Sequence, residues 1–244
     1  MDTNKKMIVR KKLATYQMDR RGILRPVMLL NELQAVADEH AELLGGGRTY
    51  CGAHNIAWVV THMIVEIDWM PDNKTEIIIE TWPAVHGNVK AVRDFRILDA
   101  VTGRVLVRAS SQWVVIDIAT RHPVRLGDVM SSWPLLSERA LDIQFDAFPD
   151  FEPTKSDTVK PRYDDVDMNQ HINNAVYGLW ATEACGADFL NTHVLRGIKI
   201  NFKREIPAET PEIHIETACG DTLSQHRLTT NDDTVNANIV CEWK

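Results

Sequence analysis

Three absences narrow what this chain of 244 residues can be. No apolar run approaches the roughly 18 residues that a membrane-spanning helix needs, and no apolar stretch follows the charged start MDTNKKMIVRKK as in a signal peptide. The four cysteines have no close spacing such as C-x-x-C, which favours reduced thiols over a disulfide framework. Acidic residues number 34 against 27 basic ones, so the positive excess typical of nucleic-acid binding is missing. We therefore expect a cytoplasmic protein with no membrane span and no nucleic-acid partner.

What is present is an ordinary globular composition with an uneven charge distribution. Hydrophobic residues make up 44% of the chain and charged residues 25%. Residues 1–130 contain 17 basic and 15 acidic residues, whereas residues 131–244 contain 10 and 19. Basic side chains crowd the start of the chain: Lys5, Lys6, Arg10, Lys11, Lys12, Arg20, Arg21 and Arg25. Either this is ordinary surface variation, or the first half attracts an acidic partner.

The order of predicted elements occurs twice along the chain. In the first half, a strand at about 7–18 precedes a helix that begins at Pro26 and stops at the glycines 45–47, and strands follow at 58–69, 75–82, 89–98 and 104–118. In the second half, a strand at 158–164 precedes a helix with Asn173 as N-cap and an apolar stripe that runs to Leu190. Strands are then predicted at 196–206, 212–219, 223–230 and 234–243, with a turn at 231–233.

A long helix followed by consecutive strands must bury its apolar stripe on the sheet, which predicts an α+β layer in each half. We accordingly predict an N-terminal domain at 1–130, a linker rich in proline, serine and acidic residues at 131–157, and a C-terminal domain at 158–244 that carries the active site.

Polar residues alternate directly before the second helix, as Asp167-x-Asn169-x-His171. In an extended segment this alternation turns all three side chains to one side, next to the unsatisfied N–H groups of a helix start. A carboxylate, an amide and an imidazole could together activate a water molecule and stabilise an oxyanion. The alternative is a polar loop that only caps the helix.

A comparison of the two halves favours a catalytic role for these three residues over a purely capping role. A shift of 147 positions places Arg20, Gly22 and Leu24 opposite the three polar residues. The first-half loop would then carry none of the three functional groups, which predicts one active site per chain, in the second half.

Around this motif the sequence resembles the acyl-acyl-carrier-protein thioesterases of plants and bacteria. The segment DMNQHINN from Asp167 to Asn174, with Tyr177, Trp180 and Glu183, is similar to that family's D-x-N-x-H-x-N-N-x-x-Y-x-x-W signature. First-half segments resemble further family landmarks in the same order: ETW at 80–82, RDF at 93–95, TG at 102–103, RASSQWVVID at 108–117 and TRHPVR at 120–125.

The resemblance implies a tandem hot-dog fold and hydrolysis of the thioester that joins a fatty acyl chain to acyl carrier protein, in fatty acid biosynthesis. It also implies that Asp167, Asn169 and His171 belong to the active site and that acyl carrier protein is the partner. We expect no cofactor. No histidine stands in a tight ligand spacing such as H-E-x-x-H, so we also expect no metal.

The segment INFKREI at 200–206 departs from the plant pattern L-E-Y-R-R-E-C. Asn201 stands where the resemblance implies a catalytic glutamate, and Ile206 stands where plant members have a cysteine. Glu205 would share a strand face with Asn201. We expect Glu183 to point to solvent and Cys185 to serve in packing.

Other classes remain open at this point. An acyl-CoA thioesterase would use the same chemistry without a protein partner, and a non-catalytic acyl-ligand sensor would share the fold. Dehydration of a hydroxyacyl chain is a further possibility on this fold. Because two internal copies can pair within one chain, the protein could be a monomer or a homodimer.

Overall fold

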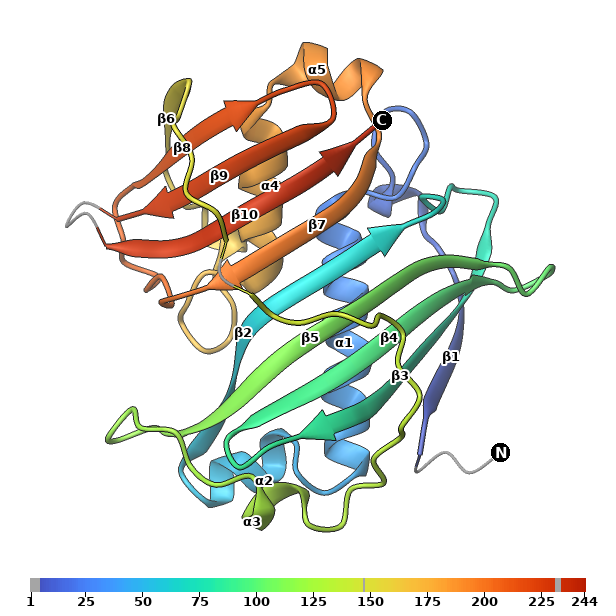
Figure 1. Ribbon diagram of the computed structural model, residues 1–244, viewed down its shortest axis with the longest axis vertical. Coiled ribbons are helices and arrows are strands. Elements are labelled where there is room, and N and C mark those ends of the chain that lie inside the picture. Colours follow the sequence, from blue (N-terminus) through green and yellow to red (C-terminus); the bar gives the residue numbers. More distant parts are fainter. Residues whose placement is uncertain (1–4, 147, 231–233) are drawn as a thin grey trace. The chain divides into compact units, whose positions relative to one another are not determined.

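The computed structural model describes residues 5–146, 148–230 and 234–244. The chain divides into two compact units, one formed by residues up to 24 together with 31–145, the other by 25–30 together with 146–244. Figure 1 colours the chain in sequence order. Each unit combines an antiparallel sheet with helices, so the predicted α+β tandem hot-dog class is confirmed.

The first unit contains a five-stranded antiparallel sheet in the order β1-β3-β4-β5-β2. Its strands are β1 (Met7–Lys12), β2 (Ile56–Ile67), β3 (Glu76–His86), β4 (Lys90–Asp99) and β5 (Val105–Asp117). The helical segments of this half are η1 (Thr15–Gln17), α1 (Pro26–Leu43), α2 (Arg48–Ala53) and α3 (Gly127–Met130).

The long helix of this half follows its sequence signals. α1 begins at Pro26, as predicted, and ends just before Gly45, which takes the left-handed conformation with φ +76°. Its apolar stripe is buried, with Leu33 at 0% exposure. His40 of α1 lies 3.0 Å from the guanidinium of Arg93 on β4, so the helix covers this face of the sheet (Figure 1). The pattern did not predict α2 or α3.

The stretch 134–141 packs on the other face of the first sheet. Asp94, which follows Arg93 and so points to the opposite side, is fully buried. Its carboxylate accepts hydrogen bonds from Arg139 Nε at 2.9 Å and from Ala140 N at 2.7 Å. Trp82 Nε1 donates to Glu138 O at 2.9 Å. Part of the segment predicted as a linker is therefore held on the first sheet, and the domain limits themselves stay a prediction.

The second unit contains a five-stranded antiparallel sheet in the order β7-β10-β9-β8-β6. Its strands are β6 (Lys155–Val159), β7 (Leu195–Phe202), β8 (Ile213–Cys219), β9 (Leu223–Thr229) and β10 (Val235–Trp243). Its helical segments are η2 (Tyr163–Asp165), α4 (Asn174–Ala184) and α5 (Ala187–Thr192). α4 lies against β8 and β10 (Figure 1), over a face of buried side chains such as Ile215 and Ile239.

Three predicted elements of the second half differ from the structure. The strand predicted at 158–164 lies at 155–159 as β6, and residues 163–165 form η2 instead. The helix predicted to run to Leu190 ends at Ala184, because Gly186 takes φ +91° and α5 starts after it. The strand predicted to run to residue 206 ends at Phe202. The predicted turn at 231–233 lies outside the described residues.

Within the described ranges, none of the helices has both the length and the hydrophobicity to cross a bilayer. The same residues contain no group of three or more His, Cys, Asp or Glu side chains placed to hold a metal ion.

Candidate active site

The segment 167–171 is a tight turn, and the extended conformation predicted for it is wrong. Asp167 N donates to His171 O at 2.8 Å, and Gln170 N donates to Asp167 O at 3.1 Å, with Gln170 at φ +63°. The Asp167 carboxylate accepts the backbone N–H groups of Asn169 at 2.8 Å and of His171 at 3.3 Å. The Asn169 amide lies 3.4 Å from the same carboxylate. The three predicted residues thus share one turn, because the aspartate bonds across it.

A second segment, 205–208, runs along this turn and brings a further carboxylate to it. Ile172 N donates to Ile206 O at 2.8 Å, and His171 forms an antiparallel bridge with Pro207. This pairing places Glu205 Oε2 at 3.8 Å from His171 Nε2. The two side chains are 32% and 30% exposed, so the pair is half-buried and open to solvent on one side.

Asn173 caps the N-terminus of α4. Asn173 accepts the N–H of Ala175 on its side chain at 2.9 Å, as its predicted N-cap role requires. Its backbone carbonyl accepts the N–H of Val176, also at 2.9 Å. Two of the first helical N–H groups are therefore occupied, so the side-chain amide of Asn169 is the better candidate donor for a developing oxyanion.

A buried carboxylate anchors the turn from the other side. Asp165 is 2% exposed and accepts three hydrogen bonds from Arg162, the closest from the backbone N–H at 2.8 Å. Asp165 O accepts the N–H of Asn173 at 2.9 Å, which ties the anchor to the helix start. Asp165 is therefore committed to structure.

The first unit contains the same turn, and it shows that the two halves correspond at a shift of 148 positions. Asp19 accepts the N–H groups of Arg21 at 2.7 Å and of Ile23 at 3.2 Å, and Gly22 stands at φ +79° where the second turn has Gln170. Asp19 N donates to Ile23 O at 2.8 Å, as Asp167 N does to His171 O. The predicted shift of 147 is wrong by one residue, and the first-half loop does carry an aspartate.

This corrected register separates loop-building residues from those that differ between the halves. Leu24 N donates to Pro71 O at 2.7 Å, the counterpart of the Ile172–Ile206 bond. In the first unit, Arg21, Ile23 and Met70 stand where the second unit has Asn169, His171 and Glu205. An aspartate is needed in both turns to bind the same two N–H groups. The amide, the imidazole and the second carboxylate occur in the second unit alone.

Glu205 is the residue that sequence reasoning placed wrongly. It follows the end of β7 and faces His171, whereas Asn201 alternates with the buried Ile200 and points away from α4. Pro207, two residues further on, was the available signal, because proline disfavours a continued central strand. Ile206 lies in the same segment with a fully buried side chain.

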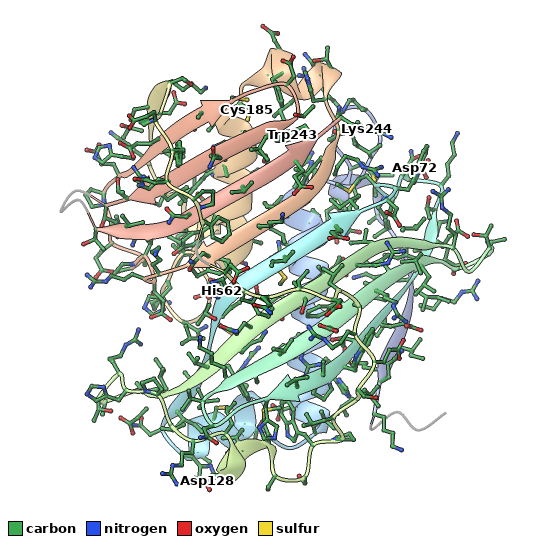
Figure 2. The ribbon with its side chains drawn as sticks, in the orientation of Figure 1. His62, Asp72, Asp128, Cys185, Trp243 and Lys244 are labelled. Carbon is green, nitrogen blue, oxygen red and sulfur yellow. The ribbon has the colours of Figure 1, made fainter. Side chains whose placement is uncertain are left out.

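Two further predictions can be compared with the structure. Glu183 is exposed, as expected. Cys185 directly follows α4 (Figure 2), and burial raises the pKa of its thiol to about 12, with a smaller effect of Cys219 in the same direction. A thiol held protonated in this way is a poor nucleophile at neutral pH, in line with a packing role.

Comparison with known families finds two matches in tandem. Residues 4–132 match the acyl-ACP thioesterase N-terminal domain, and residues 150–244 match the acyl-ACP thioesterase C-terminal domain.

Similar curated proteins are plant enzymes. A chloroplastic palmitoyl-acyl carrier protein thioesterase from Gossypium hirsutum is 30% identical over 228 residues, covering 87% of this chain and 52% of that protein. Oleoyl-acyl carrier protein thioesterase 2 from Arabidopsis thaliana is 32% identical over 200 residues, covering 72% of this chain and 53% of that protein. The chain thus spans about half the length of these relatives.

Among solved structures, an acyl-ACP thioesterase from Bacteroides thetaiotaomicron matches with a TM-score of 0.88 at 20% identity, covering 100% of both chains. The 12:0-ACP thioesterase from Umbellularia californica matches with a TM-score of 0.87 at 19% identity, over 98% of this chain and 97% of that one. At these identities the likeness establishes the fold.

Proposed function

Because this chain belongs to the acyl-ACP thioesterase family, we propose that it hydrolyses the thioester bond of fatty acyl-acyl carrier protein, releasing the fatty acid and the carrier protein. The reaction would serve fatty acid biosynthesis. The single observation that carries the proposal is the His171–Glu205 pair next to Asn169, a set of groups that the matching turn of the first unit lacks.

The proposed roles follow from the chemistry of each side chain. His171 takes a proton from a water molecule, whose oxygen attacks the thioester carbonyl carbon. Glu205 orients the imidazole and stabilises its charged form, and Asn169 donates to the developing oxyanion. The carbon–sulfur bond then breaks, and His171 returns the proton to the departing thiolate. Asp167 holds the turn that presents Asn169 and His171, as Asp19 holds its own turn.

The structure indicates which basic residues are suitable for testing the attraction of acyl carrier protein to the first half. Lys11 pairs with Glu32 at 2.7 Å, and Arg21 pairs with Asp19 at 3.0 Å, so reversing their charge would also disturb the first unit. Lys5 and Lys12 are exposed. We expect Lys5→Glu and Lys12→Glu to lower kcat/KM for an acyl-carrier-protein substrate while leaving kcat unchanged. Added salt should likewise lower kcat/KM of the wild type for this substrate.

Acyl-CoA is the second candidate substrate, because its hydrolysis does not require the basic start to attract an acidic protein. Besides Lys11 and Arg21, Lys6 pairs with Glu138 at 3.1 Å and Arg10 with Glu76 at 2.8 Å. Four cations of the basic start are thus engaged within the first unit, which weakens the case for steering an acidic protein.

The decisive experiment measures free-thiol release from matched series of acyl-carrier-protein and acyl-CoA thioesters. We expect His171→Ala to lose about 10²-fold or more in kcat, the range for removal of a general base. His214→Ala is the matched control, because His214 is also a partly exposed histidine of the second unit, 4.0 Å from a glutamate, Glu212. The control should retain wild-type turnover.

Each outcome decides between the candidates. Release from the carrier-protein series that His171→Ala abolishes supports the proposal, and release from the CoA series alone supports the second candidate. Acyl binding without release from either series would make the protein a binder. Wild-type turnover in His171→Ala would contradict the assignment of the base.

Location and assembly belong to the same proposal. We propose a cytoplasmic enzyme, supported by four cysteines that are all free, although the plant relatives are named as chloroplastic. For assembly we keep monomer or homodimer as the prediction, and light scattering on the purified protein separates the two.

A further inference from the structure

We propose that Tyr177 is a positioning residue for the hydrolysis: its hydroxyl holds the peptide of Ile206 and thereby sets the distance between His171 and Glu205. This inference rests on the proposed function. Within the part of the chain that the structure describes, the Tyr177 hydroxyl forms no hydrogen bond with His171 or Glu205, so its effect passes through the backbone of Ile206.

The Tyr177 ring is locked in place between two elements. The residue lies in the first turns of α4 and is 1% exposed. Its ring packs edge-on against Phe202, the last residue of β7, at a centroid distance of 5.4 Å, and lies 6.4 Å from the ring of Trp180. Because the ring cannot swing, the position of its hydroxyl is determined by α4 and β7 together.

That hydroxyl accepts the N–H of Ile206 at 3.1 Å, and this bond is buried. The carbonyl of the same residue accepts the N–H of Ile172 at 2.8 Å. Glu205 directly precedes Ile206, and His171 directly precedes Ile172. Ile206 therefore connects α4, through Tyr177, with both segments that carry the proposed catalytic pair.

The charges of both carboxylates of the site act on the Tyr177 hydroxyl. Burial raises the pKa of Tyr177 well above its ordinary value, the charges of Glu205 and Asp167 add to the rise, and the N–H of Ile206 opposes it. The phenol therefore stays neutral throughout the working pH range and serves as a fixed acceptor.

The first half of the chain lacks both partners of this interaction. At the shift of 148 positions, Leu29 corresponds to Tyr177, and Pro71 occupies the backbone position of Ile206. Proline has no N–H to satisfy, and leucine has no acceptor to offer. The same turn is therefore built without this hydrogen bond where the imidazole and carboxylate are also missing. The Tyr177–Ile206 hydrogen bond thus occurs only in the half that has the imidazole and the second carboxylate, and the turn itself forms without it.

The test compares Tyr177→Phe with Thr182→Val, each of which removes one buried hydroxyl from α4. Thr182 bonds to Gly178 O and Leu179 O within the helix, so its loss leaves the segment 205–208 untouched. We expect kcat per folded molecule to fall about tenfold to a hundredfold in Y177F, the range for a small misplacement of catalytic groups, with KM nearly unchanged. Thr182→Val should leave both constants at the wild-type value.

A double-mutant cycle with Glu205→Gln separates positioning from structural support. If Tyr177 acts through Glu205, the loss in kcat for Y177F together with E205Q is smaller than the product of the two single losses. Multiplicative losses, or a Y177F variant that matches Thr182→Val, would overturn the proposal.

Amide hydrogen exchange tests the same proposal without turnover. We expect the Ile206 amide to exchange faster in Y177F than in the wild type, and unchanged protection would count against the role of Tyr177. If the wild type hydrolyses no thioester, the proposed function fails, and the exchange result still shows whether Tyr177 holds the segment.

Discussion

His226 gives the protein a stability that depends on pH in a calculable way. Its ring on β9 is fully buried, with Nδ1 at 3.0 Å from Thr217 Oγ1 and Nε2 at 2.8 Å from Ser224 Oγ. Trp243 Nε1 donates to the same Ser224 oxygen at 2.9 Å. Indole is a donor only, and a hydroxyl can both donate and accept, so the two hydroxyls satisfy the neutral imidazole at both ring nitrogens. Because the ring is fully buried, the site favours its neutral form.

Burial lowers the pKa of His226 to about 3 from an ordinary value near 6.5. Between these values the unfolded chain binds a proton that the folded chain does not, so the free energy of unfolding falls as pH decreases. The slope approaches about 1.4 kcal/mol per pH unit below pH 6.5, which amounts to a loss of about 3 kcal/mol by about pH 4.5.

Urea denaturation followed by circular dichroism, in steps from about pH 7.5 to about pH 4.5, measures this loss. His226→Gln keeps a neutral hydrogen-bonding side chain at every pH and should remove most of the slope, even if it is less stable than the wild type at neutral pH. Titration of surface carboxylates affects both proteins equally and cancels in the comparison. Identical slopes for the two proteins would refute the assignment to His226.

Three further predictions concern backbone features of the two units. Asp19→Ala removes the acceptor of two N–H groups and should lower the free energy of unfolding by about 1–2 kcal/mol, while kcat per folded molecule stays constant; a changed kcat would contradict a purely structural Asp19. Asn173→Ala removes the N-cap of α4 and should cost about 1 kcal/mol in urea unfolding, and an unchanged midpoint would argue against the cap. Gly186→Ala forces a side chain onto φ +91° and should lower stability by at least about 1 kcal/mol, whereas a gain would show that the α4–α5 break is not needed.

Local signals in the sequence were sufficient for most elements. Pro26 and the glycines after residue 44 bound α1, and Asn173 caps α4 as its side chain predicts. Alternating and β-branched runs located most strands to within a few residues, because each strand buries one face. The two strands that precede the long helices were misplaced: the one predicted at 7–18 ends at Lys12, and the one predicted at 158–164 ends at Val159. The motif that carries Asp167, Asn169 and His171 could also be recognised from the sequence, since all three residues fall within one turn.

The tertiary structure decided what those local signals could not. The contact between His171 and Glu205 joins two segments that are distant in sequence, and it exists because Ile172 and Ile206 pair their backbones. Whether the two halves correspond at 147 or at 148 positions decides which first-half residue is equivalent to Asp167. Composition does not distinguish the two registers, whereas the hydrogen bonds at Asp19 do. The sequence by itself thus determined the order of elements and the turn that carries the chemistry. Only the fold decided which carboxylate holds that turn and which one meets the imidazole, because backbone pairing between distant segments sets those distances.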